Sequence, residues 1–161
     1  MDEETDKSGK TVSDPKFFSR GEIMKYAVVT GAAGGMGKAA VKKLAAEGFR
    51  VFALDKKKPE EAEGVIPIET DVTDEKSVLF AAETVRKTTD KIDAVLHFAG
   101  IYMLDSFVEM NADEINRIFN VNFFGAVTVN RVFFPFLKSG SKIVVTTSEL
   151  APLDPLPFSQ W

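Results

Sequence analysis

Four glycines that fall within seven residues are the feature of this sequence that points most directly to chemistry. They are Gly31, Gly34, Gly35 and Gly37. Glycine accepts a positive φ, and without a Cβ it lets a ligand or a helix approach the backbone closely. The helix-forming segment that follows offers unpaired backbone N–H groups and the positive end of its dipole. Residues of this type at this spacing predict a site for a phosphate group.

A carboxylate follows this turn at the distance that a nucleotide site requires. Asp55 lies 24 residues after Gly31, at the end of an apolar run, and an acidic residue roughly 20 residues on typically binds ribose hydroxyls. A glycine-rich turn alone also fits a flexible loop, but the flanking patterns favour dinucleotide binding. Asp55 favours NAD over NADP, because two like charges about 4 Å apart repel by about 4 kcal/mol at an effective dielectric of about 20. Lys56 and Lys57 oppose this preference, since a lysine can pair with a 2′-phosphate.

The elements that would position these residues alternate along the chain. Short apolar runs rich in β-branched residues predict strands, and the segments between them carry apolar residues at helical spacing. The predicted strands cover 26–30, 50–55, 65–70, 92–100 and 141–148, and the predicted helices cover 37–48, 73–87 and 112–137. We expect Thr73 to cap the second helix, Asn111 and Glu114 to cap the third, and Pro67 to lie on an edge strand.

Strands that are apolar on both faces and alternate with helices predict an α/β fold. We expect a doubly wound, Rossmann-like parallel sheet in a three-layer α/β/α arrangement that is truncated after its fifth strand. The dinucleotide-binding domain is predicted over 23–161, after a flexible polar tail over 1–22. The segment 149–161 contains three prolines and is predicted to be a loop.

Composition excludes several classes of protein. The 161 residues, 45% of them hydrophobic, fit one globular domain. The absence of cysteine and the single histidine argue against disulfides and a metal site. The net charge of −4 argues against a nucleic-acid partner. No apolar stretch reaches the roughly 18 residues of a membrane span, and no signal peptide is evident, so we expect a cytoplasmic protein.

The glycine spacing, Thr30-Gly31-x-x-x-Gly35-x-Gly37, resembles that of the short-chain dehydrogenases/reductases. The resemblance extends over about residues 25–148. Asp71-Val72 is similar to the family's Asp-Val pair near the adenine.

Three further segments carry the same resemblance. Ala99-Gly100 matches the end of the family's Asn-Asn-Ala-Gly motif, although His97 and Phe98 replace the two asparagines. Asn122 resembles the catalytic asparagine, and Ser148 resembles the catalytic serine. The alternatives are that Asn122 is a polar residue on a solvent face and Ser148 an ordinary strand-end serine. Apolar neighbours predict that Asn122 is partly buried, and His97 is predicted to be a pocket-wall or hydrogen-bonded core residue rather than a base.

The resemblance implies a set of site residues. The implied cofactor-binding residues are Thr30, Gly31, Gly34, Gly35, Met36, Gly37, Asp55, Asp71, Val72, Ala99 and Gly100, and the implied catalytic residues are Asn122 and Ser148. The implied cofactor is NAD, with NADP less favoured, and the implied reaction is hydride transfer to or from a small alcohol or carbonyl substrate.

The family's acid–base pair, Tyr-x-x-x-Lys, is missing from this sequence. In the family a lysine ammonium and the nicotinamide charge lower the pKa of the tyrosine, which is near 10 when free. Here Tyr26 and Tyr102 are each followed four residues on by a hydroxyl residue, and Trp161 stands close to where the tyrosine is expected. An indole N–H is no acid. We therefore expect the N-terminal part of a longer enzyme, inactive as these 161 residues.

Two other functions stay open: a non-catalytic NAD-binding or redox-sensing module, and a structural fragment without cofactor. The reading frame after codon 161 separates the enzyme from the module, since a Tyr-x-x-x-Lys pair there supports the enzyme. Helix 112–137 also carries more phenylalanines than one buried stripe requires, which predicts a homo-oligomer interface. These are Phe119, Phe123, Phe124, Phe133, Phe134 and Phe136.

Overall fold

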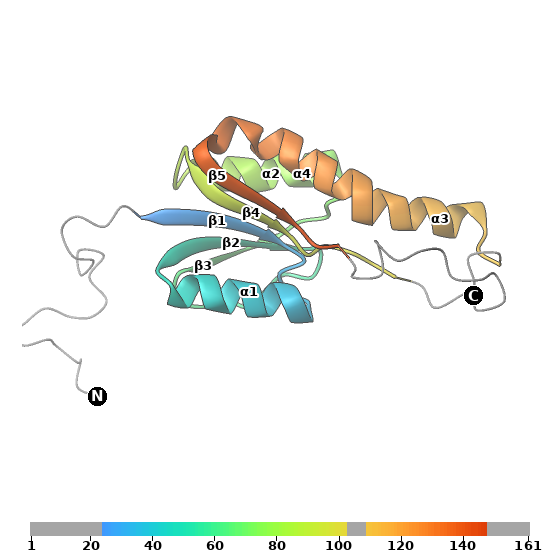
Figure 1. Cartoon of the computed structure of the whole chain (residues 1–161), viewed down its shortest axis with the longest axis horizontal. Coiled ribbons are helices and arrows are strands. Elements are labelled where there is room, and N and C mark those ends of the chain that lie inside the picture. The colour runs from blue at the N-terminus through green and yellow to red at the C-terminus, as the bar shows by residue number, and fades with distance from the viewer. Residues whose placement is uncertain (1–23, 103–108, 148–161) are drawn as a thin grey trace, which may run out of the picture.

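The computed structural model describes residues 24–102 and 109–147 (Figure 1). Five strands and the helices between them make up this part of the chain. In chain order they are β1 (Lys25–Thr30), α1 (Gly35–Ala46), β2 (Phe49–Asp55), β3 (Val65–Glu69), α2 (Glu75–Arg86), β4 (Ile92–His97), α3 (Ala112–Phe119), the π-helical segment η1 (Asn120–Phe124), α4 (Gly125–Phe133), the 3₁₀ turn η2 (Phe134–Phe136) and β5 (Leu137–Val145). The tail 1–22, Ser148 and the proline-rich segment 149–161 lie outside the described residues.

The strands form one parallel sheet in the order β3-β2-β1-β4-β5. From β1 the chain winds outward to β2 and β3, and it then returns across β1 to β4 and β5. Helix α1 covers one face of the sheet, while α2 and α4 cover the other (Figure 1). The predicted doubly wound, three-layer α/β/α fold is therefore confirmed. Pro67 lies on the edge strand β3, as predicted, where a missing N–H interrupts the ladder least.

The central strands β1 and β2 are buried on both faces because each face of the sheet has its own core. Val28 and Val29 are adjacent in β1 and both are fully buried. Val28 belongs to the core beneath α2 and α4, and Val29 to the core beneath α1. Continuous apolar runs, rather than alternating ones, are the pattern expected of strands with two covered faces.

The start of α2 corrects one prediction. Asp74, not Thr73, is the N-cap, and its side chain accepts a hydrogen bond from the backbone N–H of Lys76 at 3.0 Å. The Thr73 hydroxyl instead donates to Asp71 at 2.6 Å. At α3 the prediction is confirmed, since Asn111 and Glu114 form a capping box.

The predicted helix 112–137 is one helical run with two irregular parts. It begins at Ala112, widens into a π-helix over Asn120–Phe124, and ends in a 3₁₀ turn at Phe136. The last strand begins at once, at Leu137, which is four residues earlier than predicted, and it ends at Val145. Strand β4 ends at His97 rather than at residue 100.

The phenylalanines of this run divide into two groups. Phe133 and Phe136 are buried in the core beneath α2 and α4, at 0% and 1% exposure. The other four have more than half of their surface exposed: Phe119, Phe123, Phe124 and Phe134. Within 24–102 and 109–147, no helix has the length and apolar character to cross a membrane. The same residues contain no group of three or more side chains arranged to hold a metal ion.

Candidate functional site

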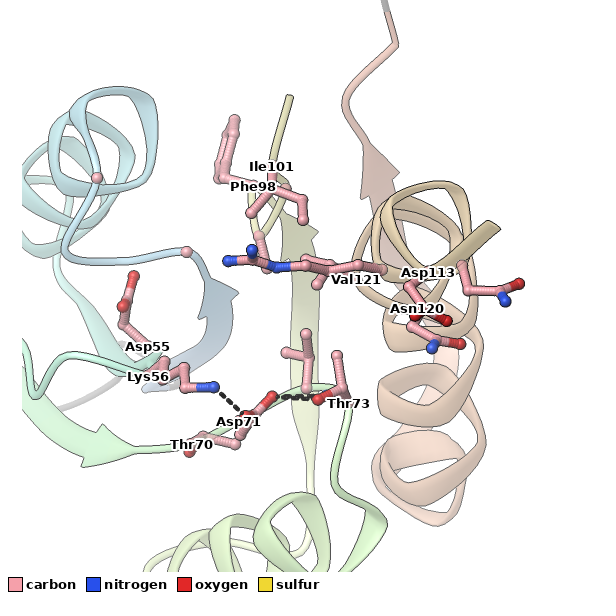
Figure 2. Close-up of a pocket in the computed structure, with 17 residues that line it drawn as sticks. Asp55, Lys56, Thr70, Asp71, Thr73, Phe98, Ile101, Asp113, Asn120 and Val121 are labelled. Atoms are coloured by element: carbon pink, nitrogen blue, oxygen red, sulfur yellow. Dashed lines mark hydrogen bonds and ion pairs between the residues drawn. The ribbon is translucent and has the colours of Figure 1, made fainter. Parts of the chain in front are cut away.

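A cleft of about 570 Å³ opens at the carboxyl ends of the strands, between the glycine turn and α3. Figure 2 shows Asp55 and Lys56 on one side of it, and Asp113 and Asn120 on the other. The turn before α1, the end of β2, the loop after β3, the loop after β4, and α3 with η1 all contribute. The lining residues are Gly31, Gly34, Asp55, Lys56, Thr70, Asp71, Val72, Thr73, Phe98, Ala99, Gly100, Ile101, Asp113, Asn116, Arg117, Asn120 and Val121.

Two glycines of the turn are required by the protein's own packing. Gly31 has a φ of +67°, and a Cβ there would lie 2.5 Å from the backbone of Phe98. A Cβ on Gly37 would lie 2.0 Å from the carbonyl oxygen of Gly31. Gly31 thus brings the turn against the loop after β4, and Gly37 brings α1 against the turn, as expected of glycine at close backbone approaches.

The other two glycines have no such steric reason. A Cβ on Gly34 would approach only the carbonyl oxygen of Gly31, at 3.4 Å, and one on Gly35 would meet no atom within 4 Å. Gly34 lines the cleft. The space beyond this part of the turn is therefore open to an incoming group.

The first turn of α1 has none of the usual capping groups. Gly34 is the N-cap and supplies no side-chain hydrogen bond, and the first turn contains no acidic residue. The first N–H groups of a helix have no intrahelical partner, and they carry the positive end of its dipole. An open backbone cradle with this polarity fits the pyrophosphate of a dinucleotide.

Asp55 is held in place at the edge of the cleft by two backbone groups. Its Oδ2 accepts the N–H of Ala33 at 3.0 Å, and its Oδ1 accepts the N–H of Lys57 at 2.9 Å. A carboxylate has about four lone-pair sites, so acceptor capacity remains for two ribose hydroxyls. The glycine turn and the end of β2 are thus joined by the side chain that was predicted to bind the sugar.

Asp71 lies at the centre of a small hydrogen-bonded group. It accepts Lys56 Nζ at 2.7 Å and both the N–H and the hydroxyl of Thr73, at 2.9 and 2.6 Å. Burial raises the pKa of the Asp71 carboxyl, but the hydrogen bonds from Lys56 and Thr73 outweigh it and bring that pKa down to about 2. Figure 2 shows the group at the side of the cleft formed by β2 and the loop after β3.

The structure brings most of the predicted cofactor residues to this cleft. Those that line it are Gly31, Gly34, Asp55, Asp71, Val72, Ala99 and Gly100. Gly35, Met36 and Gly37 lie in the first turn of α1 and are not among the residues that line the cleft. Thr30 is buried, and its hydroxyl oxygen accepts the N–H of Ala99 at 3.3 Å, so it supports the loop after β4.

Asn122 lies in η1 and supports the cleft from outside its lining. Its Oδ1 accepts the N–H of Ile101, and its Nδ2 donates to the carbonyl oxygen of Ile101, both at 2.8 Å. This pair ties the chain after Gly100 to the helix. The prediction of partial burial is wrong, because Asn122 is exposed and its amide is satisfied by the backbone of Ile101. Ser148 lies outside the described residues.

His97 is a hydrogen-bonded core residue, one of the two roles predicted for it. It is 4% exposed, and its Nε2 lies 2.9 Å from Asn130 Oδ1. Burial lowers the pKa of His97, and the hydrogen bond with Asn130 opposes this change in part. It does not line the cleft.

The wall formed by α3 was missed by sequence reasoning. Asp113, Asn116, Arg117 and Asn120 all line the cleft. Their spacing of i, i+3, i+4 and i+7 places them on one side of a helix. A polar stripe on a helix expected to pack against a sheet was the available signal.

The sequence model of the family described as "short chain dehydrogenase" matches residues 25–159. One relative, the NADPH-dependent 1-acyldihydroxyacetone phosphate reductase of Schizosaccharomyces pombe, is 27% identical over 144 residues, which cover 86% of this chain and 49% of that protein. A second, the 3-oxoacyl-(acyl-carrier-protein) reductase of Thermotoga maritima, is 32% identical over 136 residues, covering 76% and 55%.

Among solved structures, the ligand-free aldohexose dehydrogenase of Thermoplasma acidophilum superposes with a TM-score of 0.64 at 31% identity, covering 70% of this chain and 44% of that one. The chain spans about half the length of the curated relatives it matches. The family match extends over most of the chain and agrees with the sheet order, the glycine turn and the cleft described above. The chain therefore belongs to the short chain dehydrogenase family, whose members are oxidoreductases that bind a nicotinamide dinucleotide.

Proposed function

We propose that this chain is the nucleotide-binding part of an NAD-dependent oxidoreductase that transfers hydride between nicotinamide and an alcohol or carbonyl substrate. The observation that carries the proposal is the uncapped start of α1 at a glycine turn, with Asp55 fixed at the neighbouring strand end. When bound, the dinucleotide supplies the hydride donor or acceptor. The residues of this chain bind and orient it.

Each part of the cleft takes one part of the dinucleotide in this proposal. The backbone of residues 34–37 holds the pyrophosphate. Asp55 accepts hydrogen bonds from the adenosine ribose, and Asp71-Val72 borders the adenine. Ala99-Gly100 borders the half that carries the nicotinamide. By family resemblance Asn122 and Ser148 serve the catalytic step, and Asn122 does so while holding the backbone of Ile101.

Two features of the cleft support NAD over NADP. A 2′-phosphate placed beside Asp55 would face a like charge, which is unfavourable by about 4 kcal/mol at about 4 Å and an effective dielectric of about 20. Lys56, the nearest cation in sequence, is already paired with Asp71 at 2.7 Å. The relative from Schizosaccharomyces pombe is NADPH-dependent by its name. The preference must therefore come from these residues rather than from family membership.

A titration with NADH tests the binding proposal. We expect wild-type protein to quench or shift NADH fluorescence saturably, and Asp55→Ala to weaken NADH binding about tenfold, the loss of one or two charge-assisted hydrogen bonds. The same substitution should narrow the preference for NADH over NADPH. Asp90→Ala is the matched control, because Asp90 is exposed and precedes the amino end of β4, whereas the cleft lies at the carboxyl ends of the strands. Wild-type protein that does not bind NADH would overturn the proposal and leave the structural fragment.

The missing Tyr-x-x-x-Lys pair favours one further candidate, a non-catalytic NAD-binding module. We propose that these 161 residues bind NAD without turnover in either case. A chain extended by its own downstream reading frame separates the two candidates. NAD reduction by the extended chain with a panel of alcohols supports the enzyme, and NADH binding without reduction supports the module.

The exposed aromatic surface of the helical run supports a second copy of the chain as a partner. Phe119, Phe123 and Phe124 have more than half of their surface exposed, which is unfavourable for aromatic side chains in water. We expect wild-type protein to sediment as an oligomer and Phe124→Ser to shift it toward the monomer. A monomeric wild type at all concentrations would contradict this assignment.

A further inference from the structure

The polar stripe of α3 faces the cleft where an apolar stripe would be expected. None of the eight residues of α3 is buried, and four polar residues of α3 and the start of η1 line the cleft. Figure 2 places Asp113 and Asn120 across the cleft from Asp55. A helix that turns its polar side toward a cavity is arranged to meet a polar ligand there. Core packing does not explain this orientation.

More negative than positive side chains line the cleft, which is unfavourable for an anionic ligand. Three carboxylates line it, those of Asp55, Asp71 and Asp113, against the two cations Lys56 and Arg117. Lys56 is committed to Asp71 at 2.7 Å. A pyrophosphate entering this cleft therefore meets surplus negative charge, which the positive end of one helix offsets only in part.

Arg117 is the cation that remains. Within 24–102 and 109–147, the ion pairs that form do not include Arg117. Glu114, one turn earlier on α3, accepts the backbone N–H of Asn111 at 2.9 Å instead. The Arg117 side chain is exposed on the wall opposite the glycine turn.

We propose that Arg117 binds the pyrophosphate of the dinucleotide from the α3 wall, so that the phosphates lie between a guanidinium and the start of α1. The inference rests on the proposed function, since it presumes a dinucleotide in this cleft. A guanidinium is planar, always charged, and donates two parallel hydrogen bonds to a phosphate. It also offsets the carboxylates that would otherwise repel the ligand. Arg117 is thus a binding residue contributed by an element outside the glycine motif.

The test compares Arg117→Ala and Arg117→Lys with wild-type protein, using three ligands. The ligands are NADH, ADP and adenosine, of which only the first two carry a pyrophosphate. Arg131→Ala is the matched control, because Arg131 lies on α4 in the same helical run, is exposed, and pairs with Glu75 at 2.8 Å. Thermal unfolding of each variant checks that the fold is unchanged, as expected for exposed side chains.

We expect Arg117→Ala to weaken the binding of NADH and of ADP about tenfold, with adenosine unaffected. The affinity of Arg117→Lys for these two ligands should lie between those of Arg117→Ala and wild type, because an ammonium keeps the charge but lacks the paired donors of a guanidinium. The salt dependence of NADH affinity should become shallower in Arg117→Ala, and Arg131→Ala should match wild type.

Two results would overturn the inference while leaving the proposed function intact. One is NADH binding by Arg117→Ala with the affinity of wild type. The other is an equal loss for adenosine and ADP, which would place the guanidinium on the adenine ring. Failure of the wild-type protein to bind NADH overturns the proposed function itself, and with it the role of Arg117.

Discussion

Helices α1 and α2 both begin just after a strand of the same parallel sheet, yet their first turns differ in capping. At α2 the Asp74 side chain accepts the N–H of Lys76, and Glu75 adds a negative charge to the first turn. At α1 Gly34 supplies no side chain, and the first turn has no acidic residue. The protein satisfies the start of α2 with its own side chain, whereas no side chain caps the start of α1.

The partial positive charge at the start of a helix can be met by a side chain of the protein or left accessible to a ligand. A capping carboxylate typically stabilises a protein by about 1 kcal/mol. That figure is relative to alanine, and relative to glycine the gain is only a few tenths of a kcal/mol. Gly34 at the start of α1 therefore costs little stability and keeps the N–H groups accessible. The start of α3 follows α2, with its capping box of Asn111 and Glu114. A helix that begins without a cap beside a cleft, while α2 and α3 are capped, is thus a candidate ligand site. Such a site can be recognised from a single structure.

The largest effect is expected where the α1 start is held against the sheet. Gly37→Ala places a Cβ 2.0 Å from the carbonyl oxygen of Gly31, so we expect the free energy of unfolding to fall by about 3 kcal/mol or more and NADH binding to be lost. Gly35→Ala is the matched change, since its Cβ meets nothing within 4 Å, and its stability should equal or slightly exceed that of wild type. Urea denaturation of both variants measures the difference. Similar unfolding curves for the two would contradict it.

Giving α1 the cap of α2 tests the comparison directly. Gly34→Asp should weaken NADH binding by roughly tenfold or more, because the new carboxylate takes the free N–H groups and repels the phosphates. Its stability should change by only a few tenths of a kcal/mol. Gly34→Asn caps without charge and separates the two causes. Isothermal titration of both variants with NADH supplies the measurement, and unchanged affinity in Gly34→Asp would show that the start of α1 holds no anion.

The converse change removes the cap of α2. Asp74→Ala should lower the free energy of unfolding by about 1 kcal/mol and leave NADH affinity unchanged, because this cap serves the chain alone. Chemical denaturation and an NADH titration of the same sample measure both quantities, with Asp90→Ala as an exposed control. A clear loss of NADH affinity in Asp74→Ala would mean that the two helix starts do not have separate roles.

The smallest effect concerns Asp71, which joins the start of α2 to the cleft. Its folded-state pKa of about 2 lies below its ordinary value of 3.8. Its contribution to stability is therefore complete above about pH 4 and is lost as pH falls through about 2. Asp71→Asn lacks this contribution, so the stability difference from wild type should shrink over that interval. At neutral pH we expect the free energies of unfolding of Asp71→Asn and wild type to differ by less than about 1 kcal/mol, because Lys56 is 81% exposed. Chemical denaturation of both proteins at a series of pH values measures this stability difference. A difference that does not change with pH would argue against the ion pair.

The sequence predicted the sheet and the glycine turn because both leave local signals. Buried runs such as Val28 and Val29 stand out by composition alone. The spacing from Gly31 to Asp55 follows from one turn, one helix and one strand. The predicted capping box at Asn111 has the same local character.

The features that sequence reasoning missed depend on tertiary contacts or on near-equal local choices. Thr73 and Asp74 are adjacent and both suit an N-cap, so the pattern could not choose between them. Residues 138–141 have the composition of a turn, yet Gly140 takes a φ of +89° within β5, and the register against β4 shifts nearby. Arg117 was overlooked because its role depends on what lies across the cleft.

In the part of the chain that the structure describes, strand β5 lies at one edge of the sheet, and half or nearly half of the surface of Ile143, Val144 and Val145 is exposed. An apolar strand with a free row of backbone donors and acceptors is a template on which another chain can add. We expect concentrated samples of the protein to self-associate along β5. Titrations belong at high dilution, and a variant that seems not to bind NADH should first be shown to have stayed in solution.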